Sequence, residues 1–177
     1  MAELVVVIGG VRSGKSRFAE SMAAAIAPVT YLAAATAGDA EMAARIAAHR
    51  QRRPTAWRTV EEPWDVPGVV ARHPAGCLLL ECLSLWLTNL LVGVAGHEGL
   101  DDAGIRDKVA RLIDAIGQAG GRAVVVTNET GCGIMPVNEL ARRFGDLLGE
   151  ANQQLAAAAN EVYWCVAGIP VRIKPGN

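Results

Sequence analysis

The segment from residue 9 to residue 16 reads Gly-Gly-Val-Arg-Ser-Gly-Lys-Ser and matches the pattern G-x-x-x-x-G-K-[ST] in full. It follows an aliphatic run, residues 4–8, that is typical of a buried strand, and it leads into a segment, 15–27, with the character of a helix. Glycines let such a loop turn tightly, so its amide groups and the N-terminus of the helix point at phosphate oxygens. This strand–loop–helix unit predicts an α/β fold that binds a nucleoside triphosphate.

The rest of the chain continues the alternation of short apolar strands with amphipathic helices. We expect strands at residues 29–34, 57–60, 77–81, 122–127, 161–167 and 171–174, and helices at 39–50 (capped by Asp39), 84–92, 101–119 and 138–159. Such strands imply a mainly parallel sheet flanked by helices, and the length of 177 residues is typical of one domain, 1–177. Ligands of open α/β sheets bind at the carboxyl ends of the strands, where we expect the functional motifs to lie.

Residues near the phosphate loop are candidates for its chemistry. Lys15 is expected to reach the terminal phosphates, and the hydroxyl of Ser16 can ligate Mg²⁺. An acid at the end of a neighbouring strand completes such a metal site, and Glu81 has that position after the run 77–80. A helix-capping acid is the alternative role for Glu81. Asn128 and Glu129 end another strand and would reach the same crevice.

The segment 39–54 carries a second candidate site. Arg45 and His49 are four residues apart and share one face of the expected helix, while Arg50, Arg52 and Arg53 cluster at its end. Guanidinium groups bind phosphate bidentately, so these arginines form a local anion site in a chain of net charge -1. A neutral imidazole among them is a candidate nucleophile that would give a covalent phosphoramidate. On composition alone, a solvated helix face with an exposed histidine is the simpler interpretation.

The balance of charge and the cysteines restrict the partners and the compartment. With 17 basic and 18 acidic residues, the chain lacks a basic nucleic-acid footprint, so we expect no nucleic-acid partner. The four cysteines include no C-x-x-C pair, and three of them lie in or beside apolar runs, which favours a reducing compartment. The most apolar stretch, 77–94, contains Glu81 and other polar residues, so we expect no membrane span. No signal-peptide pattern opens the chain, and we expect a cytoplasmic protein.

Several motifs together resemble one enzyme family. They are 9–17 (Gly-Gly-Val-Arg-Ser-Gly-Lys-Ser-Arg), 41–46 (Glu-Met-Ala-Ala-Arg-Ile) with His49 and Arg53-Pro54, 79–83 (Leu-Leu-Glu-Cys-Leu), 88–91 (Thr-Asn-Leu-Leu), 127–136 (Thr-Asn-Glu-Thr-Gly-Cys-Gly-Ile-Met-Pro) and 152–159 (Asn-Gln-Gln-Leu-Ala-Ala-Ala-Ala). Essentially from end to end, the chain resembles the bifunctional adenosylcobinamide kinase / adenosylcobinamide-phosphate guanylyltransferase family of cobalamin biosynthesis. Val11 stands where we expect a small alanine, and Cys132 where methionine is common; neither change removes a catalytic group.

The resemblance implies two reactions at one nucleotide site. First, ATP or GTP phosphorylates the hydroxyl of the aminopropanol arm of adenosylcobinamide. Second, GTP guanylylates an enzyme histidine with loss of pyrophosphate, and GMP then passes to adenosylcobinamide phosphate, giving adenosyl-GDP-cobinamide. The residue that matches the guanylylated histidine is His49. The resemblance also implies a RecA-like P-loop NTPase fold and assembly as a homotrimer.

The family's nucleotide-contacting positions are carried over to the matching residues of this chain. They fall on Gly9, Gly10, Val11, Arg12, Ser13, Gly14, Lys15, Ser16, Ala34, Ala35, Thr36, Arg50, Gln51, Arg52, Arg53, Glu61 and Glu81. Lys15 and His49 are expected to be catalytic, and Ser16 and Glu81 to hold Mg²⁺. The arginines can neutralise charge that develops on the α-phosphate and on pyrophosphate. Glu61 could accept from the guanine or ribose, with a solvated carboxylate as the alternative.

The phosphate loop is also compatible with two other functions. A monofunctional P-loop small-metabolite kinase would need Lys15, Ser16 and Glu81 but has no use for His49. A nucleotide-dependent switch would need a partner-facing apolar patch and would form no covalent nucleotide. If the enzyme carries out both reactions, one phosphate loop must present first a γ-phosphate and then an α-phosphate to different acceptors. We therefore expect the helix that carries His49 to move.

Overall fold

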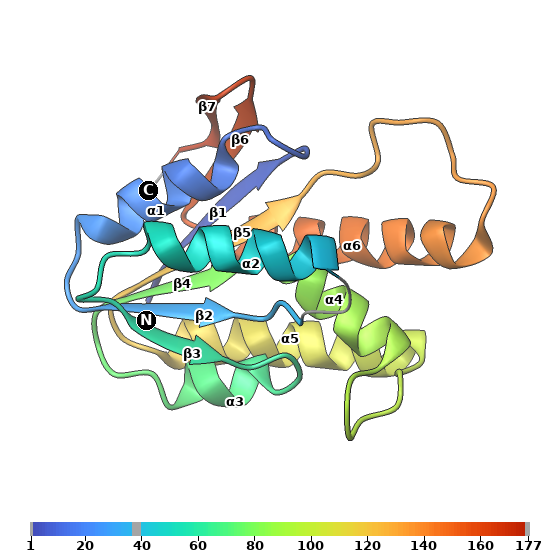
Figure 1. Cartoon of the computed structure of the whole chain (residues 1–177), viewed down its shortest axis with the longest axis horizontal. Helices are drawn as coiled ribbons and strands as arrows, with labels where there is room; N and C mark the ends of the chain where they lie inside the picture. Colours follow the sequence, from blue (N-terminus) through green and yellow to red (C-terminus); the bar gives the residue numbers. More distant parts are fainter. Residues whose placement is uncertain (1, 37–39, 176–177) are drawn as a thin grey trace.

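Seven strands form one sheet in the computed structural model of this chain, which describes residues 2–36 and 40–175 except for the side chains of Met42, Arg45 and Arg52 (Figure 1). The sheet order is β3-β2-β4-β5-β1-β6-β7. The strands are β1 (Glu3–Gly9), β2 (Val29–Ala33), β3 (Arg58–Glu61), β4 (Cys77–Glu81), β5 (Arg122–Asn128), β6 (Glu161–Val166) and β7 (Ile169–Lys174). The first six are parallel, and β7 pairs with β6 in the antiparallel direction. The expected α/β class with a mainly parallel sheet is confirmed.

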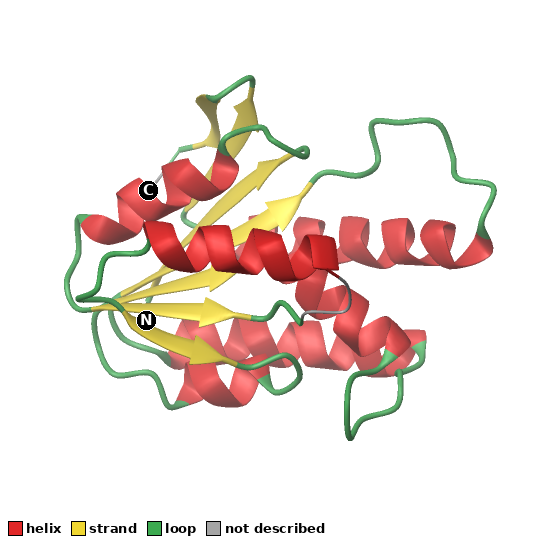
Figure 2. Cartoon of the chain, in the orientation of Figure 1, coloured by secondary structure: helices red, strands yellow, loops and turns green. Residues whose placement is uncertain are grey.

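Helices cover both faces of this sheet (Figure 2). They are α1 (Lys15–Ala24), α2 (Ala40–Arg52), α3 (Val66–Ala71), α4 (Leu83–Val92), α5 (Asp102–Gln118) and α6 (Glu139–Ala158). The helices α3 to α6 lie on one face, and α1 and α2 lie on the other (Figure 1). Among the described residues, no helix has both the length and the apolar character that crossing a membrane requires.

Alternation along the strands builds two apolar layers, because successive side chains point to opposite faces. Leu4, Val6, Leu32, Leu78, Leu80 and Val125 pack against α3 to α6, with Trp86, Leu112 and Leu148 fully buried there. Val5, Val7, Tyr31, Leu79, Val124 and Val126 face α1, which contributes only the small residues Ala19 and Ala23 as buried partners. The second face is therefore thinly covered by α1, and α2 lies over it with no buried residue among its described side chains.

Polar side chains fix several helix ends. Asp65, Asp101 and Asn138 cap α3, α5 and α6 by accepting a hydrogen bond from the amide three residues further on. The sequence does not predict α3, because Pro67 and Gly68 indicate a turn; in the structure they fall in its first turn, where Pro is tolerated. The expected cap of α2, Asp39, lies outside the described residues.

The last two strands form a tight hairpin. Ala167 and Gly168 both have positive φ (51° and 82°), the backbone that two-residue hairpin turns favour. Strand β7 therefore begins at Ile169, two residues before the expected start, and runs antiparallel at the edge of the sheet.

Candidate active site

The phosphate loop lies at the carboxyl end of β1 and continues into α1. Arg12 and Gly14 have positive φ (59° and 90°), and a Cβ added to Gly14 would lie 3.0 Å from Cα of Gly168 in the β6–β7 turn. The amide of Gly168 donates to the carbonyl of Ser13 at 2.9 Å. Glycine is therefore required at position 14, both for its backbone conformation and for the close approach of the hairpin.

Lys15 is folded over this loop. Its Nζ donates to the carbonyl of Gly10 at 3.0 Å. Ser13 is buried, whereas Val11 and Arg12 are exposed at the surface of the loop. The ammonium thus rests against the concave backbone on which a nucleotide's phosphates bind in loops of this type.

Ser16, in the first turn of α1, lies next to Glu81, the last residue of β4. The hydroxyl of Ser16 donates to Oε1 of Glu81 at 2.7 Å, although 65 residues separate them. A hydroxyl and a carboxylate are hard oxygen donors suited to Mg²⁺, which usually completes its shell with phosphate oxygens and water. Among the described residues, no group of three or more His, Cys, Asp and Glu side chains is placed to hold a metal. The pair therefore fits a magnesium ion that arrives with the nucleotide rather than a metal held by protein ligands alone.

The segment after β2 is held by a residue that sequence reasoning did not identify. Buried Asn89 on α4 donates to the carbonyls of Ala34 (2.7 Å) and Pro63 (3.1 Å). Its amide oxygen lies 3.5 Å from the hydroxyl of Thr36. Ala34 is buried, Ala35 is half-buried and Thr36 is exposed. Asn89 thus fixes the predicted nucleotide-contacting segment 34–36. The sequence feature that points to Asn89 is its position as a polar amide within an otherwise apolar helix.

Helix α2 places His49 next to α1. Nδ1 of His49 lies 3.9 Å from Oε1 of Glu20, and both residues are half-buried. Glu20 was not predicted as a site residue, because its approach depends on where α2 crosses α1. A carboxylate beside Nδ1 favours the tautomer protonated there and leaves Nε2 as the nucleophilic nitrogen.

The arginines at the end of α2 have other neighbours. Arg50 forms an ion pair with Glu61, the last residue of β3. The guanidinium of Arg53 lies 3.5 Å from the ring centroid of Tyr31, and its Nη1 is 3.5 Å from the hydroxyl of Thr59. Burial raises the pKa of Tyr31, so the phenol under Arg53 stays neutral.

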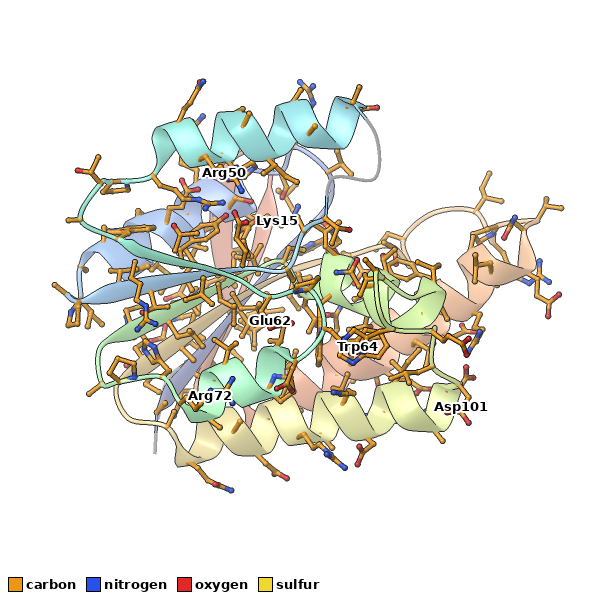
Figure 3. All side chains as sticks on the ribbon, turned by 60° about the horizontal axis from the view of Figure 1, so that its bottom comes forward. Lys15, Arg50, Glu62, Trp64, Arg72 and Asp101 are labelled. Atoms are coloured by element: carbon orange, nitrogen blue, oxygen red, sulfur yellow. The ribbon has the colours of Figure 1, made fainter. Side chains whose placement is uncertain are left out.

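The arginine cluster at the end of α2 therefore lies only partly at the carboxyl edge of the sheet, where we expect the functional motifs. Arg53 lies over the middle of β2, not at the carboxyl edge of the sheet, because α2 runs back across the face. Figure 3 shows Arg50 and Lys15 on the same side of the sheet. Gln51 is exposed, and the side chain of Arg52 lies outside the described part of the chain.

The four cysteines are free thiols, and only Cys132 is exposed. Burial raises the pKa of Cys77 to about 11 and also raises that of Cys82 and Cys165. These three thiols therefore stay protonated at neutral pH, as the sequence predicted for small buried hydrophobes.

A groove of about 640 Å³ lies elsewhere, between α5 and α6. Two ion pairs line it, Arg106 with Glu150 and Arg143 with Asp102. None of the predicted site residues lines it. We therefore place the chemistry at the phosphate loop, not in this groove.

Comparison with known proteins identifies the family of this chain. A family model described as cobinamide kinase / cobinamide phosphate guanyltransferase matches residues 5–173. The bifunctional adenosylcobalamin biosynthesis protein CobP of Pseudomonas aeruginosa is 45% identical over 172 residues, 96% of this chain and 96% of that protein. The bifunctional adenosylcobalamin biosynthesis protein CobU of Escherichia coli K12 is 43% identical over 180 residues, 97% of this chain and 99% of that protein.

A solved structure is similar in fold alone. An ATPase from the type III secretion system of pathogenic bacteria superposes with a TM-score of 0.53 at 8% identity, covering 92% of this chain and 50% of that chain. The likeness supports the P-loop NTPase class that the loop motif predicts.

Proposed function

Because the chain belongs to the cobinamide kinase / cobinamide phosphate guanyltransferase family, we propose that its phosphate loop and His49 together carry the two reactions of that family. The chain is an enzyme of adenosylcobalamin biosynthesis with kinase and guanylyltransferase activity on nucleotide substrates. It phosphorylates adenosylcobinamide with ATP or GTP, and then transfers GMP from GTP to adenosylcobinamide phosphate. The product is adenosyl-GDP-cobinamide.

In the kinase step, the phosphate loop positions the triphosphate. Backbone amides of residues 9–16 and the N-terminus of α1 bind phosphate oxygens, and Lys15 leaves the carbonyl of Gly10 to contact the terminal phosphates. Ser16 and Glu81 would hold a magnesium ion, which neutralises charge on the phosphates when bound. These residues supply orientation and charge, the two contributions on which phosphoryl transfer mainly depends.

In the guanylylation step, His49 is the nucleophile. Nε2 attacks the α-phosphorus of GTP, the bond to the bridging oxygen of pyrophosphate breaks, and pyrophosphate leaves with the electron pair. The attack puts positive charge on the ring, which the carboxylate of Glu20 stabilises at Nδ1. GMP then moves from Nε2 to a phosphate oxygen of adenosylcobinamide phosphate, which restores the neutral imidazole.

One observation carries this proposal. His49 lies beside Glu20 on α1, the same helix that begins at the phosphate loop, so nucleophile and nucleotide site share one face of the sheet. A kinase alone has no use for a histidine with a carboxylate behind it. Arg50 and Glu61 are proposed to exchange their mutual ion pair for contacts with GTP, and Arg52 and Arg53 to add positive charge.

The test uses GTP labelled at the α-phosphate, mixed with purified protein and Mg²⁺ and then denatured. We expect label on the wild type that is stable in base, lost in acid and absent from His49→Ala. A protein that takes no label but transfers γ-phosphate to adenosylcobinamide would be a monofunctional kinase, and His49 would then be a phosphate-binding or structural residue.

Assembly and location complete the proposal. We place residues 1–177 in one nucleotide-binding and transferase domain of a cytoplasmic homotrimer. Two exposed apolar surfaces support assembly: a hairpin patch (Trp164, Val166, Ile169, Val171 and Ile173) and a loop patch (Ile134, Met135, Val137 and Leu140). They lie far apart on the molecule (Figure 1), as a ring of head-to-tail contacts requires.

A further inference from the structure

Asn128 lies between the two halves of the phosphate site. Strand β5 is inserted between β1, which leads to the phosphate loop, and β4, which ends at Glu81. Asn128 is the register partner of Gly9, the first residue of the loop, and the amide of the next residue, Glu129, bonds to the carbonyl of Gly9 at 3.3 Å. Residue 128 therefore lies at the carboxyl end of the sheet, directly beside the first residue of the phosphate loop and between the strands that lead to the loop and to Glu81.

The side chain of Asn128 is held in one orientation. Its Nδ2 donates to Oγ of Ser84 at 2.6 Å and lies 3.9 Å from Sγ of Cys82. Sγ of Cys82 lies 2.9 Å from the same Oγ, and either of these two atoms can be the donor. The amide nitrogen of Asn128 therefore faces both Oγ of Ser84 and Sγ of Cys82, and its amide oxygen points away from this pair.

The backbone of Asn128 is held as well. Its carbonyl accepts from Nδ2 of Asn152 at 3.0 Å, and Oδ1 of Asn152 accepts from the hydroxyl of Thr127 at 2.8 Å. Ser84 and Asn152 are both buried polar residues, whereas Asn128 is half-buried. Within the described part of the chain, Oδ1 of Asn128 has no hydrogen-bond partner. The network thus fixes an acceptor oxygen that is left available for a ligand.

We propose that Oδ1 of Asn128 binds the acceptor hydroxyl of adenosylcobinamide and orients its oxygen toward the γ-phosphorus in the kinase step. The inference rests on the proposed function of this site. A carboxamide oxygen accepts one hydrogen bond from a neutral alcohol without adding negative charge next to the phosphates. The hydroxyl oxygen forms the new bond to phosphorus as the bond to the β-phosphate oxygen breaks. The electron pair leaves with the nucleoside diphosphate, and the proton passes to an oxygen of the transferred phosphoryl group.

The same residue has no role in the second reaction. There the acceptor is a phosphate oxygen, an anion that a carboxamide oxygen cannot bind as an acceptor. The nucleophile of that reaction, His49, lies on α2 beside Glu20 and not at the end of β5. Asn128 therefore separates the two activities: its loss impairs phosphorylation of the alcohol and spares transfer of GMP.

The experiment measures both activities and nucleotide affinity in Asn128→Ala, with Ser84→Ala as the matched control that removes the partner of Nδ2 but keeps Oδ1. We expect Asn128→Ala to lower kcat of the kinase about 100-fold, in the range typical of a lost catalytic hydrogen bond. The Kd of GTP, labelling of His49 and GMP transfer to supplied adenosylcobinamide phosphate should stay within about threefold, and Ser84→Ala should lose much less kinase activity than Asn128→Ala.

Three results would overturn the proposal. They are an unchanged kinase kcat, an equal loss of both activities in folded protein, and a loss of GTP affinity that accounts for the loss of kinase activity. Thermal melting reports whether the Asn128→Ala variant folds. If Asn128→Ala does not fold, Asn128→Ser, which keeps a short polar group at the strand end, is measured in its place. A wild type without kinase activity or label would instead refute the proposed function.

Discussion

The carboxylate of Glu20 is the residue whose role at His49 can be tested most directly. Its Oε1 lies 3.9 Å from Nδ1 of His49, with the side chains 19% and 31% exposed. At this separation, a partly screened charge pair contributes about 1 kcal/mol, so Glu20→Gln should slow guanylylation of His49 about fivefold. Quenched-flow labelling with α-labelled GTP measures this rate. An unchanged rate would show that Glu20 only packs beside the ring, and γ-phosphate transfer serves as the internal control.

Residue types and local spacing predicted the phosphate loop and Glu81 better than the contacts that the helices α2 and α4 make. The phosphate loop follows from its own eight residues, and Glu81 from its place at the end of an apolar strand; the structure brings it to Ser16. The contact of Arg53 with Tyr31 could not be predicted, because it depends on how α2 crosses the sheet. Ser84 and Asn89 were missed for the same reason, since polar residues inside an apolar helix give no indication of what they hold.

Helix α2 is the element that we expect to change position. It is packed loosely, with no buried residue among its described side chains, and few buried contacts favour local motion. Glu20, the neighbour of His49, lies five residues beyond Lys15 on α1, or about 7.5 Å along the helix axis. We expect the distance between His49 and Lys15 to shorten when GTP binds. Crystal structures with and without a non-hydrolysable GTP analogue provide the measurement, and equal distances would contradict the movement.

Elements of regular pattern were predicted well and irregular ones were not. The strand Cys77–Glu81 has the expected bounds, and α5 and α6 begin and end within one residue of the expected ranges 101–119 and 138–159. Helix α3 was missed because its six residues include Pro67 and Gly68, and a helix this short has no periodicity to detect. The start of β7 was missed because Pro170 interrupts the apolar pattern.

An ion pair across two strands gives the sheet a pH dependence. Arg122 binds Glu3 through two hydrogen bonds, of 2.8 and 2.7 Å, and lowers the pKa of Glu3 below its ordinary 4.5. A carboxyl whose pKa is lowered by folding stabilises the protein above the unfolded pKa, and this contribution is lost as pH falls through the folded pKa. We expect Glu3→Gln to lose about 1 kcal/mol at pH 7, since the pair is partly exposed. Urea unfolding should show this difference shrink below about pH 4.5; a constant difference would contradict the ion-pair origin.

The molecule as a whole exposes an apolar patch on its β6–β7 hairpin. Trp164 pairs with Val171 and Val166 with Ile169 across the β6–β7 hairpin, so these side chains share one face of it. Residues 169, 171 and 173 alternate along the edge strand β7, and all are more than 45% exposed. An exposed apolar edge strand invites association with another chain. The turn of this hairpin also contacts the phosphate loop through Gly168, so the exposed apolar patch adjoins the nucleotide site.

Disrupting the hairpin patch should therefore dissociate the homotrimer that we propose. A charge at the centre of the patch, Val171→Asp, would have to be buried without a partner in the assembly, which is strongly unfavourable. Light scattering after size-exclusion chromatography should give three times the chain mass of 18.6 kDa for the wild type and the single mass for the variant. Arg172→Gln, on the opposite face of the same strand, is the matched control and should keep the wild-type mass. A trimer that survives Val171→Asp would move the interface to another surface, and a monomeric wild type would refute the assembly altogether.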